Sequence, residues 1–168
     1  MWYVMQVRTG LEENIRLQCQ REISSDVLKG CFIPYYEEKR HIKGEWRILK
    51  RILFPGYVFL NTEELELLCI DLKHIQGFAR LLRTGDEVIP LTKDEVDFLE
   101  TFSGKERIVS ISMGVIENSK VRVISGPLVG KEGYIKKIDR HKRKAYLEIL
   151  MFERIQRIQV GLEIISKI

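Results

Sequence analysis

The sequence predicts two folded parts, an α+β domain with helices on an antiparallel sheet and then a small all-β barrel. Three observations carry this prediction. Apolar residues recur at helical spacing within the first two thirds of the chain. Short β-rich runs separated by turn residues fill the last third. The charge also divides there, with 16 Lys+Arg against 18 Asp+Glu up to residue 107 and 12 against 6 beyond it. Two units with different partners are therefore expected, and nucleic acid is a candidate for the second.

The first part, residues 1–107, alternates strands with helices. Residues 2–7 are aromatic and β-branched, which favours a strand, and Thr9 with Glu12 forms a capping box that opens a helix. Apolar residues four positions apart predict its inward face: Leu11, Ile15, Cys19 and Ile23. A second capping box is Thr92 with Glu95. The further expected elements are a charged hairpin tip at 38–44, strands at 46–53, 57–60 and 78–83, and helices at 65–74, capped by Asn61 with Glu64, and 92–102.

The second part, residues 119–168, predicts five short strands in about 50 residues, which suits a small barrel. They are expected at 120–124, 132–138, 145–152, 154–160 and 162–168, with Gly161 separating the last two. A weaker, Ser-containing segment at 108–118 predicts the linker between the parts. Residues 145–152 alternate cleanly, so one face of a strand is expected inward: Ala145, Leu147, Ile149 and Met151. The other face is expected outward: Tyr146, Glu148, Leu150 and Phe152.

Membrane, disulfide and catalytic chemistry have no support in the sequence. No apolar run approaches the roughly 18 residues of a membrane span, and residues 1–10 carry no signal-peptide pattern, so a cytoplasmic protein without membrane contact is expected. Cys19, Cys31 and Cys69 form no C-x-x-C pair, which predicts reduced thiols. Because no catalytic, cofactor or metal motif is present, we expect a binding protein that is not an enzyme and needs no cofactor or metal.

An aromatic stretch, ILFPGYVFL at residues 52–60, is the first candidate binding feature. Strand alternation cannot send Phe54, Tyr57 and Phe59 to one face without a bulge. One interpretation is a bulged core strand. The other is that at least one large aromatic reaches the surface as an anchor for a partner.

A basic cluster is the second candidate. Its members, taken as candidate RNA contacts, are Lys131, Lys136, Lys137, Arg140, His141, Lys142, Arg143 and Lys144. One interpretation is a solvated hairpin turn. The other is a polyanion site, because clustered like charges repel one another and a polyanion relieves that repulsion. Arg140 and Arg143 add planar donors that can stack on bases, and Tyr134 or Tyr146 offers a stacking face.

Three segments in this order resemble the NusG family of transcription elongation factors: WYVMQVRTG, LFPGYVFL and VRVISGPLVGKEGYIKKID. The resemblance implies a NusG N-terminal domain and a C-terminal KOW domain with an SH3-like barrel. It implies that the first domain binds the clamp helices of the large RNA polymerase subunit and bridges the DNA cleft. The residues that would line or support its apolar depression are Tyr3, Phe54, Pro55, Tyr57 and Phe59. In the family, the KOW domain recruits Rho, a ribosomal protein or RNA, and Phe152 matches its exposed, partner-binding phenylalanine.

The sequence departs from the housekeeping pattern after Phe152. Glu153 to Ile158 stand where the family usually has Gly-Arg and then Thr-Pro-Val, and the basic turn is denser. The chain is thus similar to specialised LoaP-type paralogs. The hypothesis is a monomeric processive antiterminator that binds RNA polymerase, DNA in the elongation complex and a nascent RNA hairpin. The alternatives are a general NusG-type factor that couples polymerase to Rho or the ribosome, and a KOW-type ribosome-associated RNA-binding structural protein.

Overall fold

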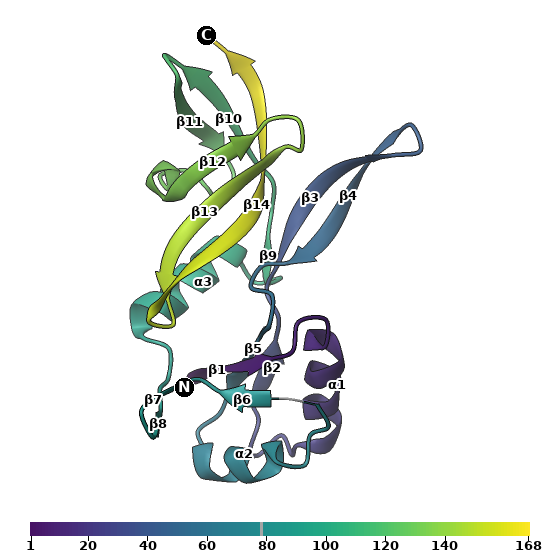
Figure 1. Ribbon diagram of the computed structural model, residues 1–168, viewed down its shortest axis with the longest axis vertical. Helices are drawn as coiled ribbons and strands as arrows, with labels where there is room; N and C mark the ends of the chain where they lie inside the picture. The colour runs from purple at the N-terminus through teal and green to yellow at the C-terminus, as the bar shows by residue number, and fades with distance from the viewer. Residues whose placement is uncertain (78) are drawn as a thin grey trace. The chain divides into compact units, whose positions relative to one another are not determined.

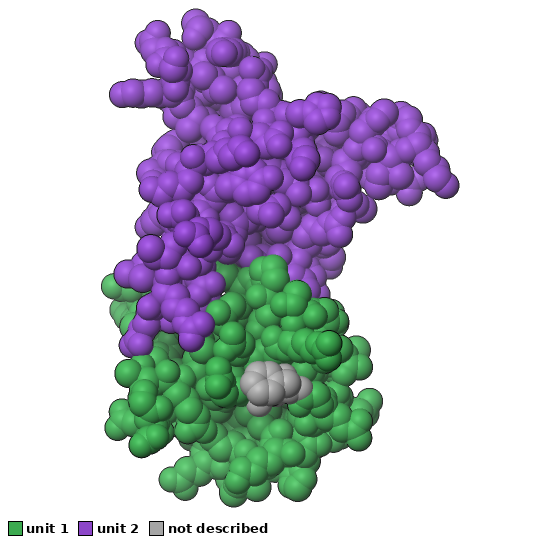
Figure 2. Space-filling model, in the orientation of Figure 1, with its two compact units in different colours: residues 1–33, 54–96 green, residues 34–53, 97–168 purple. Residues whose placement is uncertain are grey.

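The computed structural model describes residues 1–77 and 79–168, which form two compact units (Figure 1). Unit 1 contains residues 1–33 and 54–96, and unit 2 contains residues 34–53 and 97–168 (Figure 2). The hairpin at 34–53 thus packs with the C-terminal part of the chain, although it lies within the predicted first domain. The domain boundaries drawn from the sequence, at 107 and 119, stay a prediction.

Unit 1 is built on a four-stranded antiparallel sheet in the order β2-β5-β1-β6. Its strands are β1 (Trp2–Val7), β2 (Gly30–Phe32), β5 (Tyr57–Asn61) and β6 (Ala79–Leu81). The unit also contains helices α1 (Glu12–Glu22) and α2 (Leu65–Leu72) and a small hairpin of β7 (Arg83–Thr84) with β8 (Glu87–Val88). Met5, Ile15, Val58 and Leu68 are fully buried in its core. The strand predicted at 78–83 is observed as β6, while Phe78 lies outside the described residues.

The observed N-termini of the helices can be compared with the predicted capping boxes. Thr92 and Glu95 form the predicted box: the Glu95 carboxylate accepts from the Thr92 amide at 2.9 Å and the Thr92 hydroxyl accepts from the Glu95 amide at 3.1 Å. Thr92 immediately precedes α3 (Lys93–Ser103), and Glu95 lies in its first turn. The Thr9 box is wrong, because α1 begins at Glu12 after Leu11 and Thr9 lies too far upstream. The buried Glu12 carboxylate instead accepts hydrogen bonds from the amides of Gly10 and Gly56.

The predicted Asn61–Glu64 cap is also wrong. Helix α2 begins after Glu64 without a side-chain cap, and the Thr62 hydroxyl accepts from the Glu64 amide at 2.9 Å. The predicted inward face of α1 is confirmed at Ile15 and Cys19, which are fully buried. No helix in the described part of the chain is long and apolar enough to cross a membrane.

Unit 2 contains a five-stranded sheet in the order β11-β10-β14-β13-β12 and a three-stranded sheet in the order β4-β3-β9. The strands of the larger sheet are β10 (Ser112–Glu117), β11 (Lys120–Ser125), β12 (Ile135–Asp139), β13 (Lys144–Met151) and β14 (Arg154–Lys167), with a short 3-10 helix, η1 (Glu132–Tyr134). The strands of the smaller sheet are β3 (Tyr35–Ile42), β4 (Glu45–Ile52) and β9 (Ile108–Val109). Pairing is antiparallel except between β10 and β14 and between β3 and β9.

The expectation of five strands within residues 119–168 is wrong, because four strands, β11 to β14, lie there, and the larger sheet takes its fifth from outside that range. The two last predicted strands are one continuous strand, β14, which Gly161 does not interrupt. The fifth strand is β10, which lies in the segment predicted as linker. Gly161 serves a close approach instead, since an added Cβ there would lie 2.6 Å from the Glu37 carbonyl oxygen. Closure of the sheet into an SH3-like barrel stays a prediction.

The alternation of β13 is confirmed at its inward face, where Ala145, Leu147, Ile149 and Met151 are buried. Leu150 points outward and is 72% exposed. The outward assignment of Phe152 is wrong, because its side chain is only 7% exposed. Strand β13 ends at Met151, and Phe152 and Glu153 adopt φ values of 57° and 59° in a left-handed turn, where the strand period no longer applies.

Candidate nucleic-acid interface

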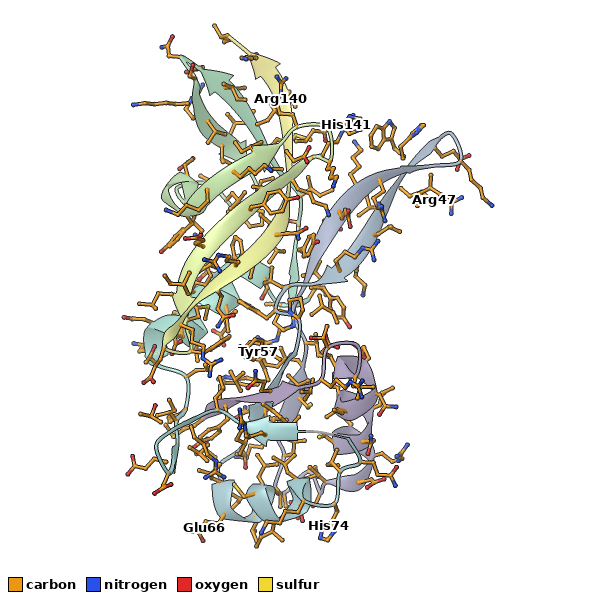
Figure 3. The ribbon with its side chains drawn as sticks, viewed as in Figure 1. Arg47, Tyr57, Glu66, His74, Arg140 and His141 are labelled. Carbon is orange, nitrogen blue, oxygen red and sulfur yellow. The ribbon has the colours of Figure 1, made fainter. Side chains whose placement is uncertain are left out.

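The basic turn joins β12 to β13, as the sequence predicts (Figure 3, where Arg140 and His141 are labelled). The Asp139 carboxylate accepts a hydrogen bond from the Lys142 amide at 2.9 Å, and the Arg143 amide donates to the Arg140 carbonyl at 3.3 Å. The Lys142 amide, with the nearby cations, holds the pKa of Asp139 below its usual range. The charged tip is therefore a hydrogen-bonded turn, and its one carboxylate, Asp139, accepts from the backbone.

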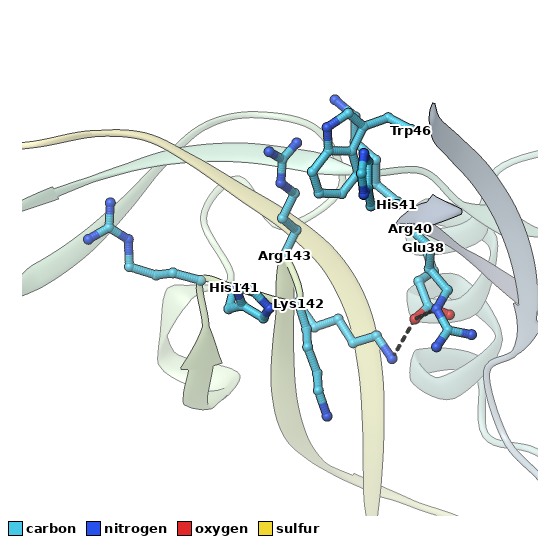
Figure 4. Close-up of a pocket in the computed structure, with 10 residues that line it drawn as sticks. Glu38, Arg40, His41, Trp46, His141, Lys142 and Arg143 are labelled. Atoms are coloured by element: carbon cyan, nitrogen blue, oxygen red, sulfur yellow. Dashed lines mark ion pairs between the residues drawn. The ribbon is translucent and has the colours of Figure 1, made fainter. Parts of the chain in front are cut away.

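The hairpin of β3 and β4 faces this turn. Strand β3 packs against β14, and the hairpin and turn together enclose a cavity of about 660 Å³, here called the basic cleft (Figure 4). Its lining consists of Glu38, Lys39, Arg40, His41, Trp46, Arg140, His141, Lys142, Arg143 and Lys144. Six of these are Lys or Arg and one is acidic. Such a surplus of positive charge in a concave site attracts a polyanion.

An indole lies on the hairpin wall of the basic cleft. The Arg143 guanidinium lies 3.8 Å from the centroid of the Trp46 ring, and His41 lies 5.0 Å from the same ring at a tilt of 53°. Trp46 nevertheless stays 47% exposed. The cleft thus combines cations with planar groups, the two kinds of side chain that bind phosphates and bases.

Two carboxylates hold the walls together. Glu38, 4% exposed, accepts from Lys144 at 2.8 Å and from Arg51 at 2.9 Å. The dashed line in Figure 4 marks its pair with Lys144. Burial raises the pKa of Glu38, but Lys144 and Arg51 together outweigh burial and leave that pKa below its usual range. Glu163 on β14 pairs with Arg143 at 2.9 Å and with Lys39 at 3.4 Å.

The predicted RNA residues therefore separate into groups. The structure brings five of them to the cleft: Arg140, His141, Lys142, Arg143 and Lys144. Among the described residues, the side chains of Arg140, His141 and Lys142 form no ion pair, whereas Arg143 and Lys144 are tied to carboxylates. The other three lie elsewhere. Lys131 lies 6.0 Å from the Phe98 ring, Lys137 lies 5.7 Å from the Tyr146 ring, and Lys136 shares a shallow pocket with Lys137.

Sequence reasoning missed the hairpin wall. Lys39, Arg40, His41 and Trp46 were assigned only to a charged hairpin and a strand. The missed signal is the density of cations in EKRHIKGEWRILKR, residues 38–51, which is six Lys+Arg against two Glu.

The aromatic candidates are mostly core. Phe54 and Phe59 are at most 1% exposed, and Phe59 stacks on Phe32 with ring centroids 5.2 Å apart. Tyr3 is also buried, and burial raises its pKa. Tyr57 is half-buried and Pro55 is exposed, so these two offer the surface of the stretch.

Comparisons with known proteins match an N-terminal and a C-terminal part of the chain to different family profiles. A family profile described as "Transcription termination factor nusG" matches residues 1–100, and one described as "KOW motif" matches residues 117–151. A "Transcription termination/antitermination protein NusG" of Staphylococcus carnosus is 27% identical over 99% of this chain and 95% of its own. Its namesake in Bacillus subtilis is 26% identical over 99% and 98%. A solved structure described as "Domain interaction in Thermotoga maritima NusG" matches with a TM-score of 0.59 at 20% identity, over 95% of this chain and 92% of that one. That likeness concerns the fold alone.

Proposed function

Because the chain belongs to the NusG family of transcription termination factors, we propose that it is a processive antiterminator, similar to LoaP-type paralogs. Its N-terminal domain binds RNA polymerase, and its KOW domain binds a nascent RNA hairpin. The mechanism is binding, and this family consists of transcription factors, not enzymes. The observation that carries the proposal is the basic cleft, where six cations surround one carboxylate.

RNA binding is supported by the state of those cations. Arg140 and Lys142 lie on a closed turn without a carboxylate partner among the described residues, so their charge is available to phosphates. Each phosphate that a cation neutralises releases counterions, which favours association at low salt. Arg143 and Lys144 spend part of their charge on Glu163 and Glu38, so we assign them mainly to shaping the cleft.

Polymerase binding is supported by family membership and by the surface of the aromatic stretch. Pro55 and Tyr57 are the accessible members, while Tyr3, Phe54 and Phe59 support them from the core. We propose that this surface contacts the clamp helices of the large polymerase subunit and that the bound factor lies beside DNA. Phe152 is buried in this structure, so we propose that it contacts a partner only in a conformation that exposes its side chain.

A general NusG-type factor is the second candidate. The full-length similarity to proteins named for both termination and antitermination favours it. In that case the basic cleft would bind nucleic acid without sequence preference.

The experiment is an RNA titration of the full chain at several salt concentrations. The hairpin transcribed upstream of a candidate target operon should bind, with log affinity falling linearly with log salt. Arg140→Ala combined with Lys142→Ala should lower both the affinity and the salt slope. The matched control, Lys120→Ala with Lys167→Ala, removes the same charge from exposed sites outside the cleft and should change little. Equal competition by random RNA would favour the general factor, and absence of RNA binding would refute the proposal.

A further inference from the structure

The shape of the basic cleft limits the kind of RNA structure that enters it. Its volume of about 660 Å³ lies within the range that encloses a small molecule, roughly 300–1,000 Å³. A paired stem keeps its bases stacked behind a deep, narrow groove that side chains do not read. A concave site of this volume matches a single unstacked nucleotide better than the outer surface of a helix.

The chemistry inside the cleft fits a base. Unpaired bases stack on aromatic rings and on guanidinium planes. Trp46 offers a half-exposed indole, and Arg143 extends the apolar and planar surface from the opposite wall at 3.8 Å. Glu163 fixes the Arg143 guanidinium through a 2.9 Å ion pair, so this stacked pair is ordered before any ligand arrives. In Figure 4, Trp46, His41 and Arg143 lie together at one side of the cleft.

The charges fit the phosphates on either side of such a base. Arg140 and Lys142 belong to the turn, whereas Lys39 and Arg40 belong to the hairpin. Lys144, which is 13% exposed and paired with Glu38, is the least accessible cation of the group. Both walls therefore carry positive charge. Lys39 pairs with Glu163 at 3.4 Å and Arg40 with Glu38 at 3.7 Å, so among the described residues of the lining the cations without an ion pair belong to the turn, and the innermost lysine is already neutralised.

We propose that the basic cleft takes one unpaired nucleotide of the bound RNA, with its base on the Trp46–Arg143 stack and its flanking phosphates on the two walls. The inference deepens the proposed function and rests on it. The hairpin of β3 and β4 then becomes half of the RNA site, and Trp46 becomes its specificity-determining residue for unpaired over paired RNA.

The experiment compares two RNA probes with the full chain: a short stem that carries one bulged adenosine, and the same stem without the bulge. Stacking on an aromatic side chain should favour the bulged stem by roughly 5- to 150-fold. Trp46→Ala should remove that preference, and Trp46→Phe should retain part of it. Ile48→Ala, an apolar truncation on the same strand outside the cleft lining, should leave the preference intact.

Fluorescence provides a second readout. The chain has two tryptophans, and Trp2 packs edge-on against Phe32 in unit 1. The bulged stem should quench emission in the unaltered chain but not in the Trp46→Phe variant. If both stems bind equally, Trp46→Ala changes nothing and Arg140→Ala with Lys142→Ala still weakens binding, the inference is wrong and the proposed function stands. If neither stem nor the leader hairpin binds, both are wrong.

Discussion

The aromatic stretch at 52–60 and the basic turn at 139–144 attract attention in the sequence for the same reason, an excess of one kind of side chain. The fold treats them oppositely. It encloses Phe54 and Phe59, and it leaves Arg140, His141 and Lys142 exposed at the rim of the basic cleft. Aromatic surface can be satisfied inside the protein by packing alone, whereas clustered cations can be satisfied there only by carboxylates.

The supply of carboxylates decides how far the second region is satisfied. Glu38 and Glu163 neutralise part of the charge of Lys144 and Arg143, and among the described residues Glu38 is the one carboxylate in the lining of the cleft. The aromatic stretch therefore stabilises the protein, whereas the basic turn keeps cations that remain available to bind an anionic partner.

The largest expected effect lies in the aromatic region. Phe59→Ala removes a fully buried ring that packs on Phe32 and Phe54, and it should lower the free energy of unfolding by about 3–5 kcal/mol. Denaturant unfolding followed by Trp2 emission in a Trp46→Phe background measures it. Tyr57→Ala, which truncates a half-buried side chain two residues away, should lower the free energy of unfolding by clearly less. Equal losses for the two variants would contradict the division between core and surface.

The next effect tests how closely the hairpin must approach the larger sheet. An alanine Cβ at Gly161 would lie 2.6 Å from the Glu37 carbonyl oxygen, and backbone cannot move aside as a flexible side chain can. Gly161→Ala should therefore cost about 1–3 kcal/mol of stability and weaken RNA binding by shifting the hairpin wall. Gly133→Ala is the matched control, because its added Cβ meets nothing within 4 Å. If Gly161→Ala leaves the RNA affinity unchanged, the position of the β3–β4 hairpin does not matter for RNA binding.

Local patterns in the sequence predicted part of the local structure: one of the three expected helix caps and the inward face of β13 are confirmed. The Thr92–Glu95 cap and the inward face of β13 are each decided by residues a few positions apart, so period and spacing suffice. The turn at Phe152 broke the pattern because two left-handed residues end the strand there. Strand β10 was missed although its pairing with β11 is local, because Ser112 and Gly114 weaken its β pattern and its pairing with β14 joins residues about 50 positions apart.

The cleft was only half predictable for the same reason. Its two walls come from residues 38–46 and 140–144, and no periodicity within either segment reports the other. One signal was present: Tyr36 and Glu38 share the inward face of β3, and a carboxylate at an inward position implies a buried cation partner. Lys144 is that partner, together with Arg51.

Glu38→Gln tests that partnership at a smaller scale. The amide keeps the shape of the side chain but leaves Lys144 and Arg51 without their shared anion, so stability should fall by about 1–2 kcal/mol. Glu45→Gln, which removes an exposed carboxylate 3.6 Å from Arg47 on the same hairpin, should change stability by less than about 0.5 kcal/mol. Thermal or denaturant unfolding of both variants gives the comparison, and indistinguishable values would mean that Glu38 does not anchor the cleft.

The smallest effect is the pH dependence of the same contact, and its sign follows from the pKa shift. The pKa of Glu38 lies below its usual range in the folded chain because Lys144 and Arg51 favour the ionised form. The unfolded chain therefore binds the proton first as pH falls, and the stability that Glu38 contributes is complete above about pH 4.3 and is lost as pH drops through the lower, folded value. The stability difference between the unaltered chain and Glu38→Gln should accordingly stay constant from neutral pH down to that point and shrink below it. Unfolding curves for both proteins across this range measure the difference, and a gap that stays constant into strong acid would show that the ionised carboxylate is not what joins the two walls.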